Sequence, residues 1–173
     1  MEISDLISIG IIKRSFGNDG FVVVIPEIDF SEQFLELSKV FVVFSDETVL
    51  LKTVQSCKIT KNNILIKFSN TKNKFDALSL KKAKIMIPKT EFNKLSKNKL
   101  YDFHLVGFEV FLENGKKIGK IDYIFSNNAN NILAIKNAER EILIPLLDQF
   151  IKEIVKSENK IIVKSIKGLL DVN

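Results

Sequence analysis

The stretch LISIGIIKRSFGNDGFVVVI, residues 6–25, contains two runs of apolar, mostly β-branched residues with a polar turn between them. Short runs of this composition, bounded by glycine and asparagine, are typical of strands. Gly17 and Gly20 stand at the two ends of the turn, where glycine tolerates the positive φ angles that tight turns need. We therefore predict strands over Leu6–Lys13 and Gly20–Ile25 that pair as a hairpin.

The rest of the first half continues this alternation of short apolar runs and polar breaks. A single helical turn is expected at Ser31–Leu35, and a helix over Asn73–Lys82 is expected to plug one end of a barrel. Pro88 ends the last apolar run because proline has no amide hydrogen for a sheet ladder. Further strands are predicted at Lys39–Phe44, Val49–Val54, Cys57–Thr60, Ile64–Phe68 and Lys84–Ile87.

A change of composition after Pro88 marks a domain boundary, because the sequence there turns polar and rich in lysine. We expect a first barrel over residues 1–88 and a second over residues 100–173. Residues 89–99 are predicted to be a short basic linker between them.

The second half also reads as short strands joined by turns. Asn114-Gly115 is a pair favoured in tight hairpins, and Glu158-Asn159 separates the last two strands. Leu146–Ile151 is predicted to be a short helix. The strands are predicted at Phe108–Leu112, Lys117–Phe125, Ile132–Ile135, Glu141–Ile144, Glu153–Val155 and Lys160–Val163. The fold class is therefore all-β, with two small antiparallel domains, each a β-barrel or a sandwich, joined by a short basic linker, and a few short helices.

Composition sets limits on compartment and class. The chain has 173 residues, of which 46% are hydrophobic, enough for a core in each domain. Its longest apolar runs are far shorter than the roughly 20 residues of a spanning helix, and its first residues are acidic where a signal peptide is basic. Cys57 is the only cysteine, which fits a reducing compartment. We expect a monomeric cytoplasmic protein.

The charge favours an anionic partner without identifying it. Lysine and arginine number 26 against 21 acidic residues, a formal net charge of +5. Only Arg14 and Arg140 are arginines, so nearly all of the positive charge is lysine. Lysine binds phosphates as a point charge and lacks the planar fork that reads guanine edges, so sequence-specific base recognition is not expected.

Catalytic equipment is scarce in this sequence. His104 is the only histidine, so neither a histidine-rich metal site nor a pair of catalytic histidines is possible within one chain. Cys57 lies in the other half of the chain, in a strand-like run, so a Cys-His pair carries little weight. The stretch Gly115–Lys120 lacks the spacing of a phosphate-binding loop and reads as a hairpin. We therefore expect a protein that is not an enzyme and that has no catalytic residues, no cofactor and no metal.

Three segments are candidates for partner contact. The turn after Phe16 displays Lys13 and Arg14 and is either a plain hairpin or an interaction tip. Leu100–His104 packs aromatic residues close together, either for interdomain packing or for a partner. A basic stretch is either a solvated surface or a phosphate-facing patch; it contains Lys81, Lys82, Lys84, Lys89, Lys94, Lys97 and Lys99.

The order of these segments resembles the RimM family of ribosome maturation factors, from about Leu6 to Asp171. The resemblance is strongest in the second half. The sequence departs from the family pattern at Ser15-Phe16-Gly17, where Pro-His-Gly is common, and at Leu100, where an aromatic residue is common. It also departs at His104, where aspartate is usual. The matching segments are Ile9-Gly10, Gly17, Gly20, Val22, Phe34–Leu37, Val40–Val42, Tyr101, Leu105–Val110, Asn114-Gly115, Ile118–Lys120, Ala129–Leu133, Glu141–Pro145 and Gly168–Asp171.

The resemblance implies a translation-factor-like N-terminal barrel joined to a PRC barrel. It implies binding to the head of the immature small (30S) ribosomal subunit through the nineteenth small-subunit ribosomal protein, with rRNA backbone contact left open. Such proteins promote subunit assembly and 16S rRNA processing without catalysis. The residues expected to contact the partner are Leu100, Tyr101, Phe103, Lys13, Arg14, Phe16, Lys97 and Lys99.

Two other functions compete with this one. A general RNA-binding or RNA-chaperone module is supported by the positive charge, and is weakened by the scarcity of arginine and the lack of an obvious stacking platform. A hydrolase or RNA-modifying enzyme ranks last because one histidine and one cysteine do not make a site.

Overall fold

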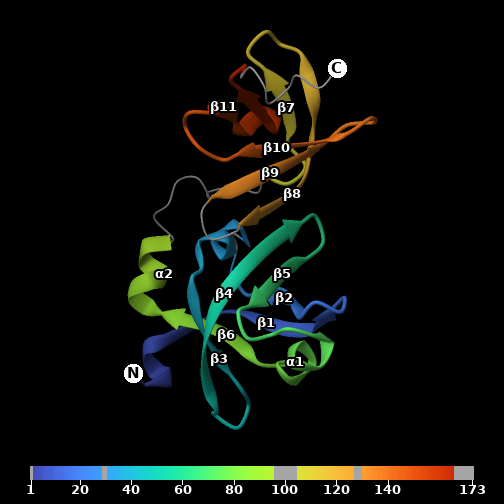
Figure 1. The fold of residues 1–173 in the computed structure, drawn as a ribbon. Helices are drawn as coiled ribbons and strands as arrows, with labels where there is room; N and C mark the ends of the chain where they lie inside the picture. The colour runs from blue at the N-terminus through green and yellow to red at the C-terminus, as the bar shows by residue number, and fades with distance from the viewer. Residues whose placement is uncertain (1, 29–30, 96–104, 127–129, 166–173) are drawn as a thin grey trace. The chain divides into compact units, whose positions relative to one another are not determined.

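The computed structural model describes residues 2–28, 31–95, 105–126 and 130–165 (Figure 1). The chain divides into two compact units, Met1–His104 and Leu105–Asn173. Among the described residues, no helix combines the length and the hydropathy that a membrane span requires.

The first unit is a closed barrel in which every strand pairs antiparallel with two neighbours. In sheet order the pairs are β1–β2, β2–β5, β5–β4, β4–β3, β3–β6 and β6–β1, the last of which closes the barrel. The all-β prediction is confirmed. The strands are β1 (Leu6–Phe16), β2 (Phe21–Pro26), β3 (Lys39–Val43), β4 (Val49–Thr60), β5 (Ile64–Phe68) and β6 (Lys84–Pro88).

Strand β4 corrects one expectation, because the two strands predicted at Val49–Val54 and Cys57–Thr60 are a single strand. The register against β5 shifts between Val54 and Ser56, as at a β-bulge. A bulge takes up an extra residue and lets the strand bend without ending. The polar break at Gln55-Ser56 therefore marks a bend in one strand.

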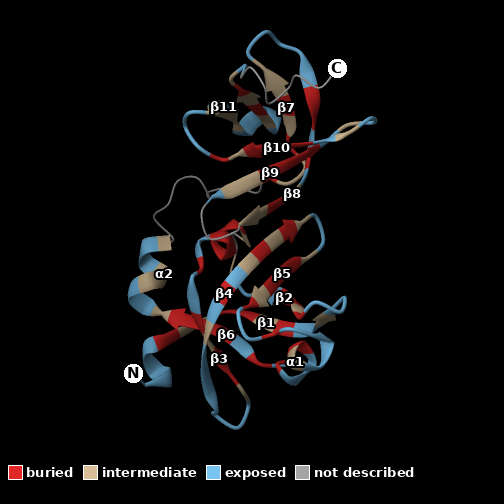
Figure 2. Ribbon diagram, in the orientation of Figure 1, coloured by how far each residue is buried: buried red, intermediate tan, exposed pale blue. Residues whose placement is uncertain are grey.

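All six strands of the barrel contain buried residues (Figure 2). Phe34 and Phe68 are fully buried, and Phe34 comes from the short 3-10 helix η2 (Ser31–Glu36), which confirms the predicted helical turn. A second short 3-10 helix, η1 (Ile3–Asp5), precedes β1. Large apolar side chains at the centre of a barrel stabilise it by removing area from water.

Helix α1 (Lys74–Ser79) begins at the predicted cap, where Asn73 Oδ1 accepts from the amides of Phe75 at 2.9 Å and Asp76 at 3.0 Å. It ends earlier than predicted, since Lys82 adopts a positive φ of 71° on the way into β6. The buried residues of this segment are Ala77 and Leu80, whereas Phe75 is 82% exposed.

Helix α2 (Lys89–Leu95) occupies the start of the range expected as a linker. It follows β6 directly and packs against β6 and β1. The rest of that range, from residue 96, lies outside the described residues.

The second unit is a six-stranded sheet in the order β11-β12-β7-β8-β9-β10. One pairing corrects the antiparallel expectation, because β12 runs parallel to β7. Parallel neighbours need a long connection, and most of this unit lies between these two strands in the chain. The elements are β7 (Glu109–Leu112), β8 (Lys117–Ser126), β9 (Asn131–Lys136), β10 (Glu141–Pro145), β11 (Ile151–Val155), η4 (Lys156–Glu158) and β12 (Lys160–Val163).

The helix predicted at Leu146–Ile151 is wrong. The amides of Phe150 and Ile151 both donate to the Leu147 carbonyl at 2.9 Å, which makes one turn that is not continued. Ile151 then pairs with Val163 as the first residue of β11. Pairing with β12 ends the turn before a helix can form.

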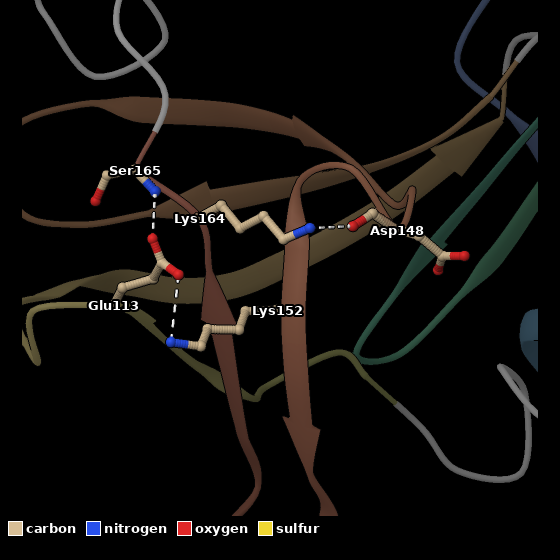
Figure 3. Close-up of polar contacts among 5 residues, drawn as sticks. All are labelled: Glu113, Asp148, Lys152, Lys164 and Ser165. Carbon is tan, nitrogen blue, oxygen red and sulfur yellow. Dashed lines mark hydrogen bonds and ion pairs between the residues drawn. The ribbon is translucent and has the colours of Figure 1, made fainter.

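Polar contacts fix the last described residues of the chain (Figure 3). The Glu113 carboxylate accepts from Lys152 Nζ at 3.3 Å and from the Ser165 amide at 3.5 Å, and Lys164 Nζ donates to the Asp148 carbonyl at 2.8 Å. These hydrogen bonds, that from Lys152 first, lower the pKa of Glu113. One carboxylate on the β7–β8 turn therefore ties together β11 and the residues that follow β12.

We predict that Glu113→Gln lowers the thermal midpoint at neutral pH, and that the difference from the unaltered protein shrinks in acid. A carboxyl whose pKa is lowered by folding stabilises the fold above its unfolded pKa, and this contribution is lost as the pH falls through the folded pKa. Thermal melts across the acid range measure it. Glu153→Gln, an exposed change next to Lys152, is the control, and an equal effect from both variants at every pH would contradict the assignment.

Candidate partner-binding site

The end of strand β1 exposes two consecutive cations. The register against β2 shifts between Ile12 and Arg14, which leaves Lys13 as the extra residue of a bulge. In a regular strand successive side chains point to opposite faces, and a bulge breaks this alternation. As a result Lys13 and Arg14 are both exposed next to the turn.

The outer face of the hairpin carries two aromatic rings, each with a cation over it. The Arg14 guanidinium lies 5.9 Å from the centroid of Phe16, and Lys67 Nζ lies 5.7 Å from the centroid of Phe21. Phe21 is the register partner of both Phe16 on β1 and Lys67 on β5. Three strands therefore contribute to one surface, which we call the hairpin surface: Arg14, Phe16, Phe21 and Lys67.

This surface is exposed enough to meet a partner. Phe16 retains 42% of its accessible area. Arginine and aromatic side chains are enriched in protein interfaces, and a ring already held by a cation loses little rotamer freedom on binding.

The turn is held by a close backbone contact with the loop before α1. Gly20 has φ +83°, and a Cβ there would lie 2.1 Å from the Thr71 carbonyl oxygen. Thr71 is itself buried, and its hydroxyl donates to the Phe68 carbonyl at 2.9 Å. Gly17, at φ +64°, has open space around the position that a Cβ would take, with no atom within 4 Å. Only Gly20 is therefore required by packing.

The predicted site residues divide into two groups. Lys13, Arg14 and Phe16 come together on the hairpin as expected from the sequence. Phe21 and Lys67 were missed, although a turn over 17–20 already places residue 21 opposite Phe16. The others lie outside the described residues, as does His104: Lys97, Lys99, Leu100, Tyr101 and Phe103.

Cys57 lies in the barrel wall and is 1% exposed. Burial raises the pKa of its thiol far above the ordinary value, so the reactive thiolate is disfavoured. Among the described residues, no three histidine, cysteine, aspartate or glutamate side chains are grouped to hold a metal ion.

Comparison with known proteins gives two domain matches in chain order. The RimM N-terminal domain matches residues 7–92, and the RimM PRC barrel domain matches residues 102–169. The ribosome maturation factor RimM of Carboxydothermus hydrogenoformans is 32% identical, covering 97% of this chain and 98% of that protein. The chain belongs to the RimM family.

Other RimM proteins match over similar lengths. The ribosome maturation factor RimM of Bacillus subtilis is 31% identical, covering 95% of this chain and 96% of that protein. A crystal structure of a RimM protein from Pseudomonas aeruginosa is 21% identical, covers 94% of this chain and 98% of that chain, and has a TM-score of 0.49. The hairpin surface lies within the part matched by the RimM N-terminal domain.

We predict that Gly20→Ala lowers the free energy of unfolding by about 2–4 kcal/mol, from the left-handed backbone and the clash with Thr71 together. Urea denaturation measures the change. Gly17→Ala is the matched control. It should lower the free energy of unfolding by only about 1–2 kcal/mol, the cost of an alanine in the left-handed backbone conformation. Equal losses from the two variants would show that the contact with Thr71 has no energetic role.

We also predict that Cys57 reacts with a chromogenic disulfide reagent only as fast as the protein unfolds. The thiol is buried and its pKa is raised, so the folded protein presents no thiolate. The reaction rate should rise with urea in parallel with unfolding. Rapid, complete reaction without denaturant would contradict this prediction.

Proposed function

We propose that this protein is a ribosome maturation factor that binds the head of the immature small ribosomal subunit through the nineteenth small-subunit ribosomal protein. It promotes subunit assembly and 16S rRNA processing without catalysis. The observation that carries the proposal is the match of both RimM domains, in order, with relatives named ribosome maturation factor RimM that align over nearly the whole chain.

The side chains of the hairpin surface support the proposed contact because their positions are fixed before a partner binds. Arg14 and Phe16 both lie on strand β1, which pairs with β2, next to a turn that Thr71 holds in place. A preorganised arginine and aromatic pair pays less ordering entropy on binding than flexible side chains do. We propose this surface, with Lys13 beside it, as one part of the ribosome contact.

The second part of the proposed contact is the segment between the two domain matches and the start of the PRC barrel domain. Tyr101 and Phe103 are its aromatic anchors, because aromatic residues dominate the binding energy of protein interfaces. Lys97, Lys99 and Leu100 complete the set that the family resemblance suggests.

A protein of this kind needs no catalytic group to speed maturation. Binding one conformer of the subunit head more tightly than another shifts the population toward that conformer. A hundredfold difference in affinity corresponds to about 2.7 kcal/mol, enough to make a minor conformer the main one. The proposed role is to hold a head intermediate in a form on which later steps act.

A general RNA-binding module is the alternative, favoured by the formal net charge of +5. Binding driven by lysine–phosphate contacts weakens steeply as salt rises, whereas binding through aromatic anchors changes little. Salt dependence therefore separates the two functions.

We predict saturable binding of the purified protein to the isolated nineteenth small-subunit ribosomal protein, at low and at raised salt. Phe16→Ala, Tyr101→Ala and Phe103→Ala should each weaken it about tenfold, since loss of an anchor costs more than 1 kcal/mol. Calorimetric titration gives the dissociation constants. Phe75→Ala is the control, because Phe75 is an 82% exposed aromatic outside the proposed contact.

Three results would decide between the functions. Salt-resistant binding that the anchor variants weaken supports the ribosomal-protein contact. No binding to that protein, with salt-labile binding to naked rRNA, favours the RNA-binding module. Equal losses in Phe75→Ala and in the anchor variants would remove the assignment of these residues.

A further inference from the structure

The charged side chains that line a groove in the second unit are nearly all cations. It consists of two adjoining cavities of about 370 and 420 Å³ between the start of β8 and the β9–β10 turn, which share Lys117, Ile118 and Asn137. One carboxylate, from Glu139, lies among the lining residues. Five positively charged side chains line the groove: Lys116, Lys117, Lys120, Lys136 and Arg140.

Asn137 holds the two walls of this groove together. Its side-chain Nδ2 donates to the Ile118 carbonyl of β8 at 3.0 Å. Its Oδ1 accepts from the amides of Glu139 and Arg140, each at 3.0 Å. A single side chain thus uses both of its functional groups to fix the turn against the strand, so the groove is formed before any ligand arrives.

The lysines of the groove are only partly neutralised within the protein. Lys117 pairs with Glu109, and Glu109 is also the register partner of Lys120. Lys120 and Lys136 are direct cross-strand partners, a like-charge arrangement that disfavours the sheet, and Lys136 has Glu141 as its register partner on the other side. Lys116 and Lys136 form no ion pair with any residue that the structure describes.

We propose that this groove binds the phosphate backbone of RNA. The inference rests on the proposed function and adds to it a direct contact with rRNA through the second unit. A polyanion can contact several of the five lining cations at once, which a single carboxylate cannot do.

The same lining indicates that the contact does not read sequence. Four of the five cations are lysines, which bind phosphate as point charges. The apolar side chains of the lining are those of Ile118, Ala138 and Ile142, and none of the lining residues that the structure describes has an aromatic ring on which a base could stack. The groove is therefore suited to backbone phosphates rather than to bases.

The test uses the full chain and an unmodified 16S rRNA transcript. The affinity for RNA falls as salt rises, so the plot of log affinity against log salt has a negative slope. In the double variant Lys116→Gln/Lys136→Gln this slope should be shallower by about 1.5–2, because two phosphates are no longer neutralised. Lys39→Gln/Lys61→Gln removes the same charge from exposed positions in the first unit and should leave most of the slope intact. Thermal melts confirm folding, since substitutions of exposed side chains away from the core change stability little.

Glu139→Gln tests the groove in the opposite direction. It removes the only lining carboxylate and should tighten RNA binding several-fold. Equal losses in the groove and control pairs, or no effect of Glu139→Gln, would overturn the proposal.

Binding to the nineteenth ribosomal protein, measured with the same variants, separates this inference from the proposed function. If the groove variants bind the ribosomal protein as the unaltered protein does but bind RNA more weakly, the result supports both the proposed function and the RNA-binding groove. If RNA binding depends on the groove and the ribosomal protein is not bound at all, the groove stands and the proposed function fails. If the ribosomal protein is bound and no variant alters RNA binding, the groove fails alone.

Discussion

Strand β1 must pair with β2 along one edge and β6 along the other while it bends round the barrel. It does so with a register shift on each side, between Ile12 and Arg14 against β2 and between Ser8 and Gly10 against β6. Bulges let a strand turn without losing its partners. The shift at Lys13 also places two cations on the surface, so the same irregularity closes the barrel and forms the hairpin surface.

Polar side chains tie the turns of both units in a common way. Thr71 forms hydrogen bonds with both backbone groups of Phe68 and packs against Gly20, and Asn137 in the β9–β10 turn donates to a backbone carbonyl of strand β8. Short strands leave many loop amides and carbonyls without ladder partners, and small polar side chains satisfy them. Most exposed residues of both candidate surfaces therefore lie on strands next to turns whose geometry is fixed.

Alternating apolar runs were enough to predict nearly every strand and the all-β class, because burial of one face imposes a period of two on the sequence. Features that depend on distant partners escaped prediction. Pairing with β5 carries β4 through Gln55-Ser56, and pairing with β12 stops a helix before Ile151. On the hairpin, Lys13, Arg14 and Phe16 were predictable from one turn, whereas Lys67 comes from another strand. The basic groove draws on two separate hairpins, and Gly115–Lys120 alone reads only as a turn.

The two candidate surfaces differ in chemistry, and the difference suits a factor that must both find and leave its target. Lysines attract a polyanion at a distance and raise the rate of encounter, but salt screens this attraction. Aromatic anchors act only in contact, and their loss mainly changes the rate of dissociation. Two contacts made by one chain raise its overall affinity only while the target presents both binding sites in a compatible geometry. On the proposed function, a maturing subunit that moves either site out of place would release the factor without any catalytic step.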